Sequence, residues 1–177
     1  MTGFGRTGTM FAFNQTNIMP DIICLSKGLT GGSIPLAATV CTKEIYNAFL
    51  SDDKAKMFFH SSSYTANPIA CAAACANLEI WQNNDILKDV KRINDFYQTQ
   101  IERFKNLGCK NVRTLGDIFA YEVNHTGNDY VSNIGVKLYE YFRKNGVLLR
   151  PLGNTVYVMP PYCISNESLE KVFNIME

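Results

Sequence analysis

The stretch Asp21-Ile22-Ile23-Cys24-Leu25-Ser26-Lys27-Gly28 decides the fold of this chain of 177 residues. Its apolar run has the length of a β-strand, and the lack of polar alternation favours a strand that is buried on both faces. Glycines at 28, 31 and 32 then interrupt the chain, and a second strand is expected over residues 36–41. The sequence therefore predicts an α/β fold in which Lys27 stands at the end of a buried strand.

The position of Lys27 suits a particular chemistry. A lysine that forms a Schiff base with an aldehyde must be held at a fixed point in a water-poor site, where desolvation lowers the pKa of its amine. The glycines that follow Lys27 let the backbone approach a cofactor closely. A lysine after a strand is more often a solvated surface residue, so its placement alone does not assign this chemistry.

The remaining sequence divides into two parts near Asn83-Asn84. Asn67-Pro68 predicts the start of an alanine-rich helix that runs to Trp81. A second helix is expected over 86–107, with an apolar stripe that we assign to the core. The tail predicts strands over 112–115 and 118–123, helices over 131–144 and after Ser165, and a hairpin of 147–150 with 155–159. We therefore expect domains of residues 1–84 and 85–177.

Composition argues against several classes of protein. The 17 basic and 16 acidic side chains leave a formal charge of +1, which gives no electrostatic basis for binding nucleic acid or an anionic membrane. No stretch approaches the roughly 20 apolar residues of a membrane-spanning helix, and the first residues lack the apolar core of a signal peptide. The six cysteines and two histidines are scattered, so we expect neither a metal site nor disulfides. We expect a cytoplasmic protein.

Four blocks of sequence share one resemblance. They are Thr2-Gly3-Phe4-Gly5-Arg6-Thr7-Gly8, Pro20-Asp21-Ile22, Ser26-Lys27-Gly28-Leu29-Thr30-Gly31-Gly32 and His60-Ser61-Ser62-Ser63-Tyr64-Thr65-Ala66-Asn67-Pro68. In order and spacing they resemble the class III aminotransferases, which are fold-type I enzymes that depend on pyridoxal 5'-phosphate. The resemblance implies that residues 1–84 are the C-terminal segment of the large, cofactor-binding domain. It likewise implies that residues 85–177 are a small α+β domain.

The same resemblance implies roles for individual residues. Lys27 would hold pyridoxal 5'-phosphate and act as the catalytic base and acid. Ser63, with Ser62 beside it, would contact the cofactor phosphate of the partner subunit in a homodimer. Ser61-Ser62 replaces the Gly-Pro pair that is usual in the family, which puts the conformation of this loop in question. Arg6 would line the active site from the glycine loop.

The tail block Arg150-Pro151-Leu152-Gly153-Asn154-Thr155-Val156-Tyr157 implies substrate contacts. Arg150 would pair with a substrate carboxylate, a task that suits the guanidinium fork, and Tyr157 would lie against the substrate. The block resembles the branch of the family that converts 8-amino-7-oxononanoate to 7,8-diaminononanoate in biotin biosynthesis, with S-adenosylmethionine as amino donor. The branches that act on ornithine, acetylornithine or 4-aminobutyrate remain alternatives.

Part of a family enzyme has no counterpart in this sequence. The aspartate that keeps the pyridine nitrogen of the cofactor protonated would stand just before Thr2. The chain thus corresponds to less than half of a family enzyme, and we expect it to need the N-terminal half. By itself it should expose apolar surface and strand edges, and so oligomerise or dissolve poorly. The alternative is a catalytically silent fragment that associates through the helix over 68–81.

The glycine loop also has a second interpretation. Gly3-x-Gly5-x-x-Gly8 matches the spacing of a dinucleotide-binding fingerprint. That motif requires a strand before it and a helix after it. Residues 9–13 instead favour an extended segment, so we assign no nicotinamide site.

Overall fold

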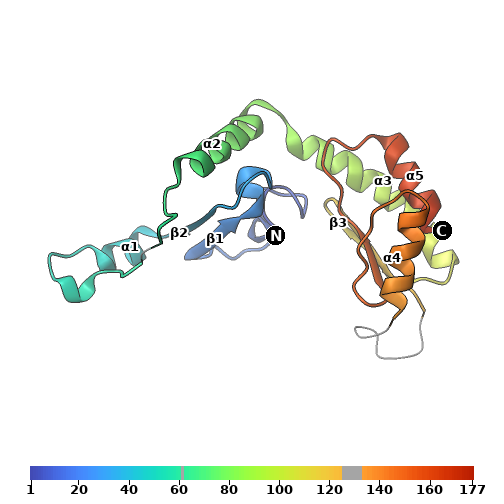
Figure 1. Ribbon diagram of the computed structural model, residues 1–177, viewed down its shortest axis with the longest axis horizontal. Coiled ribbons are helices and arrows are strands. Elements are labelled where there is room, and N and C mark those ends of the chain that lie inside the picture. Colours follow the sequence, from blue (N-terminus) through green and yellow to red (C-terminus); the bar gives the residue numbers. More distant parts are fainter. Residues whose placement is uncertain (61, 125–132) are drawn as a thin grey trace. The chain divides into compact units, whose positions relative to one another are not determined.

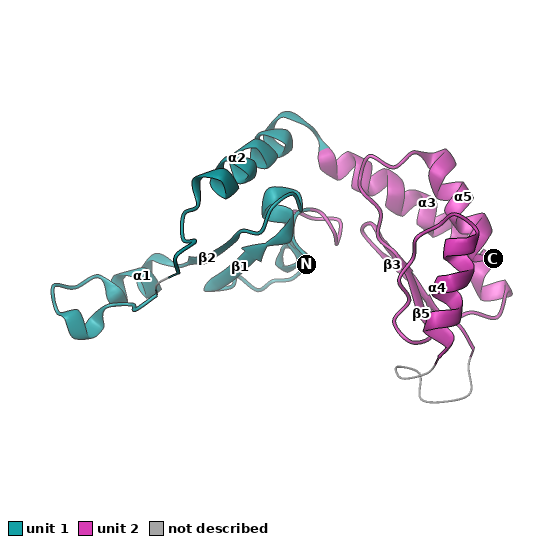
Figure 2. Cartoon of the chain, in the orientation of Figure 1, with its two compact units in different colours: residues 1–4, 11–85 teal, residues 5–10, 86–177 magenta. Residues whose placement is uncertain are grey.

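The computed structural model describes residues 1–60, 62–124 and 133–177. These residues form two compact units, coloured separately in Figure 2. Unit 1 comprises residues 1–4 and 11–85, and unit 2 comprises residues 5–10 and 86–177. Most of the glycine loop, from Gly5 onward, therefore belongs with the C-terminal part of the chain. Within the described ranges, no helix has both the length and the apolar character needed to cross a membrane.

Unit 1 is built on an antiparallel pair of strands, β1 (Ile22–Ser26) and β2 (Ala37–Cys41), drawn as blue arrows in Figure 1. Both strands lie where the sequence predicts them. The burial on both faces that the sequence predicts for β1 is absent in this chain by itself, where β1 alternates between exposed and half-buried residues. All of β2 is exposed, which agrees with the apolar surface and strand edges expected of the isolated chain. A sheet of two strands has no inner strand and buries its faces only when another layer packs on it.

Helix α2 (Pro68–Asn83) begins at the predicted residue. The side-chain oxygen of Asn67 accepts hydrogen bonds from the backbone N–H groups of Ile69 and Ala70, at 3.0 and 3.2 Å. The small side chains of Ala70 and Ala74 are buried, which allows close approach of other segments. Unit 1 also contains α1 (Lys43–Phe49) and the short 3-10 helices η1 (Ala12–Gln15), η2 (Lys27–Thr30) and η3 (Lys54–Lys56).

The segment after the glycine loop differs in part from its predicted form. We expected residues 9–13 to be extended, whereas η1 already includes Ala12 and Phe13. The ring of Phe11 stacks on that of Phe13 at 5.7 Å and meets Phe4 edge-on at 5.8 Å, contacts that a tight turn brings together. Neither form supplies the long helix that a dinucleotide fingerprint requires.

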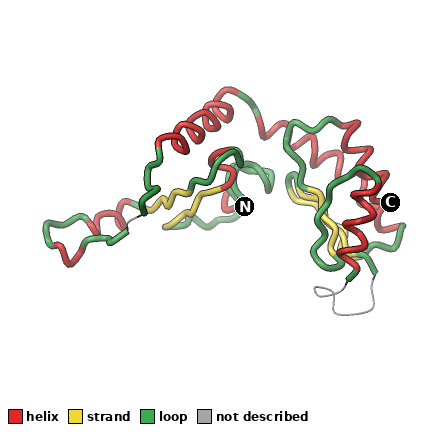
Figure 3. Tube along the Cα trace, viewed as in Figure 1, coloured by secondary structure: helices red, strands yellow, loops and turns green. Residues whose placement is uncertain are grey.

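Unit 2 contains an antiparallel sheet of order β3-β4-β5, shown in yellow in Figure 3. Its strands are β3 (Lys110–Leu115), β4 (Ile118–Glu122) and β5 (Thr155–Val158). The predicted hairpin of 147–150 with 155–159 is wrong, because residues 147–150 form no strand and β5 pairs with β4. Pro151 has no N–H to donate, and a single bridge between Leu152 and Thr155 is all that forms there.

Three helices pack with this sheet around one core: α3 (Ile86–Asn106), α4 (Ile134–Lys144) and α5 (Asn166–Met176). The apolar stripe predicted on α3 is confirmed as core, since Val90, Ile93, Tyr97 and Phe104 are at most 1% exposed. The rings of Phe119 in β4 and Phe173 in α5 lie 4.9 Å apart in an edge-on arrangement. Residues 131 and 132, with which we expected the helix over 131–144 to begin, lie outside the described residues.

Unit 1 has little core by comparison and leaves many large apolar side chains in solvent. The most exposed include Met19 at 78%, Phe59 at 77% and Ile18 at 70%. Apolar surface of this extent marks an interaction surface or an aggregation-prone one. Oligomerisation of the isolated chain stays a prediction.

Candidate active site

The candidate active site lies where β1 ends, at Lys27, the first residue of η2. The φ angle of Lys27 is +52°, in the left-handed region that side-chain-bearing residues rarely adopt. Its carbonyl oxygen accepts hydrogen bonds from the N–H of Gly32 at 3.0 Å and from the hydroxyl of Thr30 at 3.4 Å. Backbone strain of this kind persists only where the surroundings hold it, and it concentrates at functional sites. The backbone of Lys27 is therefore fixed.

The side chain of Lys27 is free, in contrast to its backbone. It is exposed, and its amine has no hydrogen-bond or ion-pair partner among the described residues. The strands around Lys27 are also exposed in this chain by itself, so the water-poor setting stays a prediction for the complete enzyme. A free amine on a fixed backbone is the arrangement that a covalent cofactor anchor needs.

Helix α2 holds the loop that follows Lys27. The side-chain amide of Asn77 donates to the carbonyl oxygens of Gly28 and Leu29, at 2.9 and 3.2 Å. Gly28 is also close to Phe4, since a Cβ added at Gly28 would stand 2.8 Å from the Phe4 ring. Asn77 was not among the residues predicted for the site. The available signal was an amide side chain within an otherwise small and apolar run.

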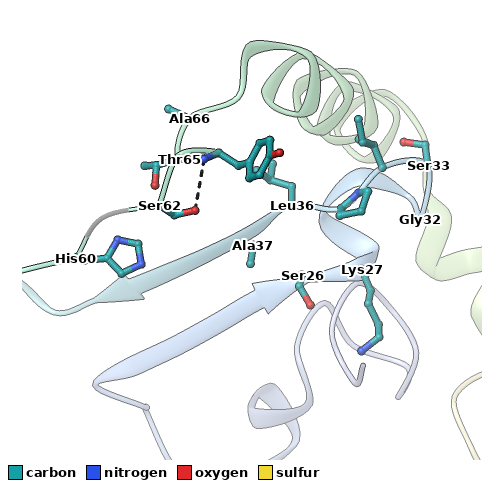
Figure 4. A pocket seen from close by; sticks show the side chains of 13 residues that line it. Ser26, Lys27, Gly32, Ser33, Leu36, Ala37, His60, Ser62, Thr65 and Ala66 are labelled. Atoms are coloured by element: carbon teal, nitrogen blue, oxygen red, sulfur yellow. Dashed lines mark hydrogen bonds between the residues drawn. The ribbon is translucent and has the colours of Figure 1, made fainter.

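A cavity of about 920 Å³ adjoins Lys27, and its lining includes Ser26, Ser62, Thr65 and His60. In Figure 4 the Lys27 side chain runs away from Ser62, Thr65 and His60, which lie together beyond β2. The hydroxyl oxygen of Ser62 accepts a hydrogen bond of 3.4 Å from the backbone N–H of Tyr64. One chain thus places its lysine and these side chains at the same cavity without directing the amine toward them.

The other serines of this loop are placed differently. Ser63 lies on the same exposed turn but does not line the cavity. Ser61 lies outside the described residues. The predicted phosphate contacts of Ser62 and Ser63 therefore stay predictions.

Arg6, also predicted for the site, belongs to unit 2, where it pairs with Asp117. Its Nη1 donates to a carboxylate oxygen of Asp117 and, at 2.8 Å, to the carbonyl oxygen of Pro160. The guanidinium carbon also lies 4.7 Å from the centre of the Tyr162 ring, a cation–π contact. The hydrogen bonds from Nη1 fix one edge of the guanidinium. The side chain of Arg6 is 28% exposed, so part of it is accessible to solvent.

Asp117 is fully buried in the two-residue turn between β3 and β4. Burial raises the pKa of its carboxyl to about 6, and the Arg6 guanidinium opposes part of that rise. Burial likewise raises the pKa of Tyr162 to about 12. Asp117 was not predicted from the sequence, because an acid after glycine in a hairpin turn is ordinarily exposed and no local signal distinguishes this one.

The glycine loop is clamped to the same turn through its backbone. The N–H of Asp117 donates to the carbonyl oxygen of Arg6 at 3.2 Å. A Cβ added at Gly116 would stand 2.4 Å from that oxygen and 2.4 Å from the nitrogen of Gly8. The side-chain amide of Asn94 donates to the carbonyl oxygen of Gly116 at 2.8 Å, which ties the turn to α3. These contacts hold Arg6 against unit 2.

Arg150 and Tyr157 also lie in unit 2. Arg150 is exposed in the irregular segment before β5 and has no hydrogen-bond or ion-pair partner among the described residues. Tyr157 is half-buried in β5, opposite Ala120 of β4. An unpaired, exposed guanidinium is available to a carboxylate ligand. The substrate contacts of both residues stay predictions.

Comparison with known proteins identifies the family. The family model described as aminotransferase class-III matches residues 1–177. Adenosylmethionine-8-amino-7-oxononanoate aminotransferase of Synechococcus elongatus is 41% identical over 174 residues, which are 98% of this chain and 41% of the relative. The protein of the same name from Helicobacter pylori is 43% identical over 176 residues, 96% of this chain and 40% of the relative.

Solved structures agree with this assignment. The crystal structure of adenosylmethionine-8-amino-7-oxononanoate aminotransferase from Methanocaldococcus jannaschii matches with a TM-score of 0.87 and 32% identity, over 99% of this chain and 43% of that one. A thermostable (S)-enantioselective omega-transaminase from Thermomicrobium roseum matches with a TM-score of 0.89 and 27% identity, over 98% of this chain and 40% of that one.

The chain therefore spans about 40% of the length of these curated relatives. Its architecture is the α/β fold of their pyridoxal-phosphate-dependent class, as the C-terminal portion of the large domain followed by a small α+β part. A match that covers the whole chain establishes the family. This chain belongs to the class III aminotransferases.

Proposed function

We propose that this chain forms part of an enzyme that transfers an amino group from S-adenosylmethionine to 8-amino-7-oxononanoate, yielding 7,8-diaminononanoate for biotin biosynthesis. The observation that carries the proposal is the identity of about 40% to relatives named for this activity, sustained along nearly the whole chain. Residues 1–84 would be the C-terminal segment of the cofactor-binding domain, and residues 85–177 the small domain. A cytoplasmic location is part of the same proposal.

The residues at the end of β1 fit pyridoxal 5'-phosphate. Lys27 offers a free amine on a fixed backbone, and the adjoining cavity of about 920 Å³ lies within the range of small-molecule sites. When bound, this cofactor supplies an electron sink for the carbanion that transamination requires. The amine of Lys27, once released by the amino donor, would carry the proton between the donor's α-carbon and the cofactor's C4′.

The phosphate-binding serines are best explained by a homodimer. The Lys27 side chain runs away from Ser62 in Figure 4, so one chain does not aim both groups at one ligand. In the proposed dimer, Ser62 and Ser63 of each subunit would donate hydroxyl hydrogen bonds to the phosphate of the cofactor held by the partner. The large exposed apolar side chains of unit 1 would be covered in that assembly or by the N-terminal half.

Substrate binding falls to the cationic and aromatic residues of unit 2. Arg150, exposed and without a partner among the described residues, would bind the substrate carboxylate bidentately. Tyr157 would lie against the substrate, and Arg6 would line the active site, where the amino donor and the keto acceptor bind in turn. None of these assignments requires a residue that the chain lacks.

A second candidate is another class III transamination, of the omega-amine, ornithine, acetylornithine or 4-aminobutyrate type. The similarity to the omega-transaminase of Thermomicrobium roseum, with a TM-score of 0.89, favours keeping it. Its amino donors carry no sulfonium group. Replacing S-adenosylmethionine by glutamate, acetylornithine or an alkyl amine in the assay separates the two candidates.

The test of the proposed function is reconstitution. The chain would be expressed together with the N-terminal part of the Helicobacter pylori relative that it does not match, and pyridoxal 5'-phosphate added. We expect an absorption band near the visible–ultraviolet boundary that disappears in Lys27→Ala and persists in Lys43→Ala, a control lysine in α1. Absence of a Lys27-dependent band in a folded complex would refute the proposed role of this chain in catalysis.

A further inference from the structure

The guanidinium of Arg6 is bonded to the protein through one nitrogen, and the side chain is partly exposed to solvent. Its Nη1 makes the hydrogen bonds to Asp117 and Pro160. The remaining N–H groups, on Nε and Nη2, have no partner among the described residues, and the side chain is 28% exposed. These free donors have one fixed orientation, because Tyr162 stacks on the guanidinium and Asp117 holds its edge.

Asp117 also cancels the charge of Arg6. Its carboxylate is fully buried, and above neutral pH it is ionised beside the guanidinium. The other titratable groups that act on this pair are the phenols of Tyr97 and Tyr162, which burial keeps neutral by raising the pKa of each. The pair therefore presents N–H donors to a ligand without a net positive charge.

This carboxylate is held at a cost that Arg6 does not fully offset. Oδ1 of Asp117 is buried without a hydrogen-bond partner among the described residues. Burying a carboxylate with one oxygen unpaired is unfavourable, and a neutral side chain of similar size would avoid the cost. A buried acid that does not optimise stability points to a role in function.

We propose that Asp117 determines donor specificity: by neutralising Arg6, it makes this part of the site favour an amino donor without a second carboxylate over a dicarboxylate donor such as glutamate. The inference rests on the proposed function, in which Arg6 lines the active site where the amino donor binds. An isolated guanidinium would attract the second carboxylate of glutamate and repel the sulfonium cation of S-adenosylmethionine. The guanidinium paired with Asp117 attracts a carboxylate and repels a sulfonium only weakly. It still donates hydrogen bonds to neutral acceptors.

The kinetic test uses Asp117→Asn, which restores the full charge of Arg6 with almost no change of shape. In the reconstituted enzyme we expect the ratio of kcat/KM for glutamate to kcat/KM for S-adenosylmethionine to rise about tenfold, mainly through KM. The matched control is Asp89→Asn, which removes an exposed acid that pairs with Arg92 in the same unit. A ratio within about twofold of wild type would overturn the proposal, since it would leave Asp117 a purely structural role.

A second measurement does not depend on transamination. The 177-residue chain, labelled with ¹⁵N-arginine, would be titrated with glutarate, a dicarboxylate that has no amino group. We expect the Arg6 side-chain signals of Asp117→Asn to shift at roughly tenfold lower glutarate than those of wild type, because the unpaired guanidinium attracts the ligand. Equal titrations would refute the proposal even if the enzyme is active.

The two measurements separate the possible failures. One outcome is that Asp117→Asn binds glutarate at lower concentration than wild type while the reconstituted wild type uses neither amino donor. In that case the proposed function fails and the effect of Asp117 on the charge of Arg6 stands. If Asp117→Asn loses its helical circular dichroism, Asp117→Ser serves as a second neutral variant. With Asp117→Ser the same change in the titration is expected, and its absence would count against the proposal.

Discussion

Asn77 on α2 donates a hydrogen bond of 2.9 Å to the carbonyl oxygen of Gly28, 49 positions earlier in the chain. The same amide donates to Leu29 at 3.2 Å, so it holds both residues that follow Lys27. The amine of Lys27 has no hydrogen-bond or ion-pair partner in the part of the chain that the structure describes. Its position thus depends on α2, although no residue of α2 is among the described residues that line the cavity.

Replacing Asn77 should therefore loosen the lysine loop. Asn77→Asp turns a donor into an acceptor that faces two carbonyl oxygens, and we expect unit 1 to lose about 2–3 kcal/mol of unfolding free energy. Asn77→Ala should cost about 1–2 kcal/mol, and Asn83→Ala, at the exposed end of α2, close to nothing. Urea unfolding followed by fluorescence of Trp81, the chain's single tryptophan, measures these values. Equal stabilities of Asn77→Asp and Asn83→Ala would contradict the conclusion that the Asn77 amide holds the loop after Lys27.

The left-handed backbone of Lys27 predicts that glycine is more stable than alanine at this position, the reverse of the order at an ordinary helical position. With φ at +52°, Lys27→Gly should be more stable than Lys27→Ala by about 1 kcal/mol. At an ordinary helical position alanine is the more stable of the two by a similar amount, about 1 kcal/mol. Alanine and glycine at Gln98, exposed in the interior of α3, supply that comparison. If alanine is preferred at both positions, the strain at Lys27 is absent in solution.

Gly116 should tolerate no side chain. A Cβ there would stand 2.4 Å from backbone atoms of the glycine loop, and φ is +59°. We expect Gly116→Ala to destabilise unit 2 by more than about 3 kcal/mol, or to release residues 5–10 from it. Gly146→Ala is the matched control, because its φ is +82° and nothing lies within 4 Å of the added Cβ.

That control separates clash from backbone strain, which alone costs about 1 kcal/mol. Hydrogen exchange of the amides at residues 5–10 and 116–118 shows whether the loop has detached. Similar stabilities of the two glycine variants would mean that the close approach at Gly116 is not maintained.

Asp117 predicts how the stability of unit 2 depends on pH. The pKa of its carboxyl is about 6 in the folded chain, against 3.8 in the unfolded chain. Between these values the folded chain binds more protons, so the contribution of Asp117 is full below pH 3.8 and is lost as the pH rises through about 6. Arg6 opposes the shift, and the nearby phenols of Tyr97 and Tyr162 stay neutral throughout this range.

Asp117→Asn isolates this effect, because asparagine does not titrate. We expect the stability of wild type minus that of Asp117→Asn to fall by up to about 3 kcal/mol from pH 4 to pH 7. Urea unfolding of both chains, measured side by side at each pH, cancels the titration of all other groups. A difference that is constant or rises with pH would show that Arg6, and not burial, has the larger effect on the pKa of the Asp117 carboxyl.

The local elements followed from the sequence because their signals are local. Asn67-Pro68 set the start of α2, and the glycine after position 107 set the end of α3. The apolar period of α3 identified its buried face. The predicted strand at 147–150 was wrong, and the reason is again local, since Pro151 cannot donate to a ladder. The predicted extended segment at 9–13 was wrong from Ala12 onward, where η1 begins.

The sequence by itself determined the family and Lys27, since that lysine is recognised by the order of residues around it. Only the tertiary structure decided what surrounds each site residue. It exposed Lys27, turned its side chain away from Ser62, and joined Arg6 to Asp117 across 111 positions of chain. Burial and pairing depend on contacts between segments distant in sequence, and the same Gly-Asp turn would be solvated if the glycine loop did not cover it.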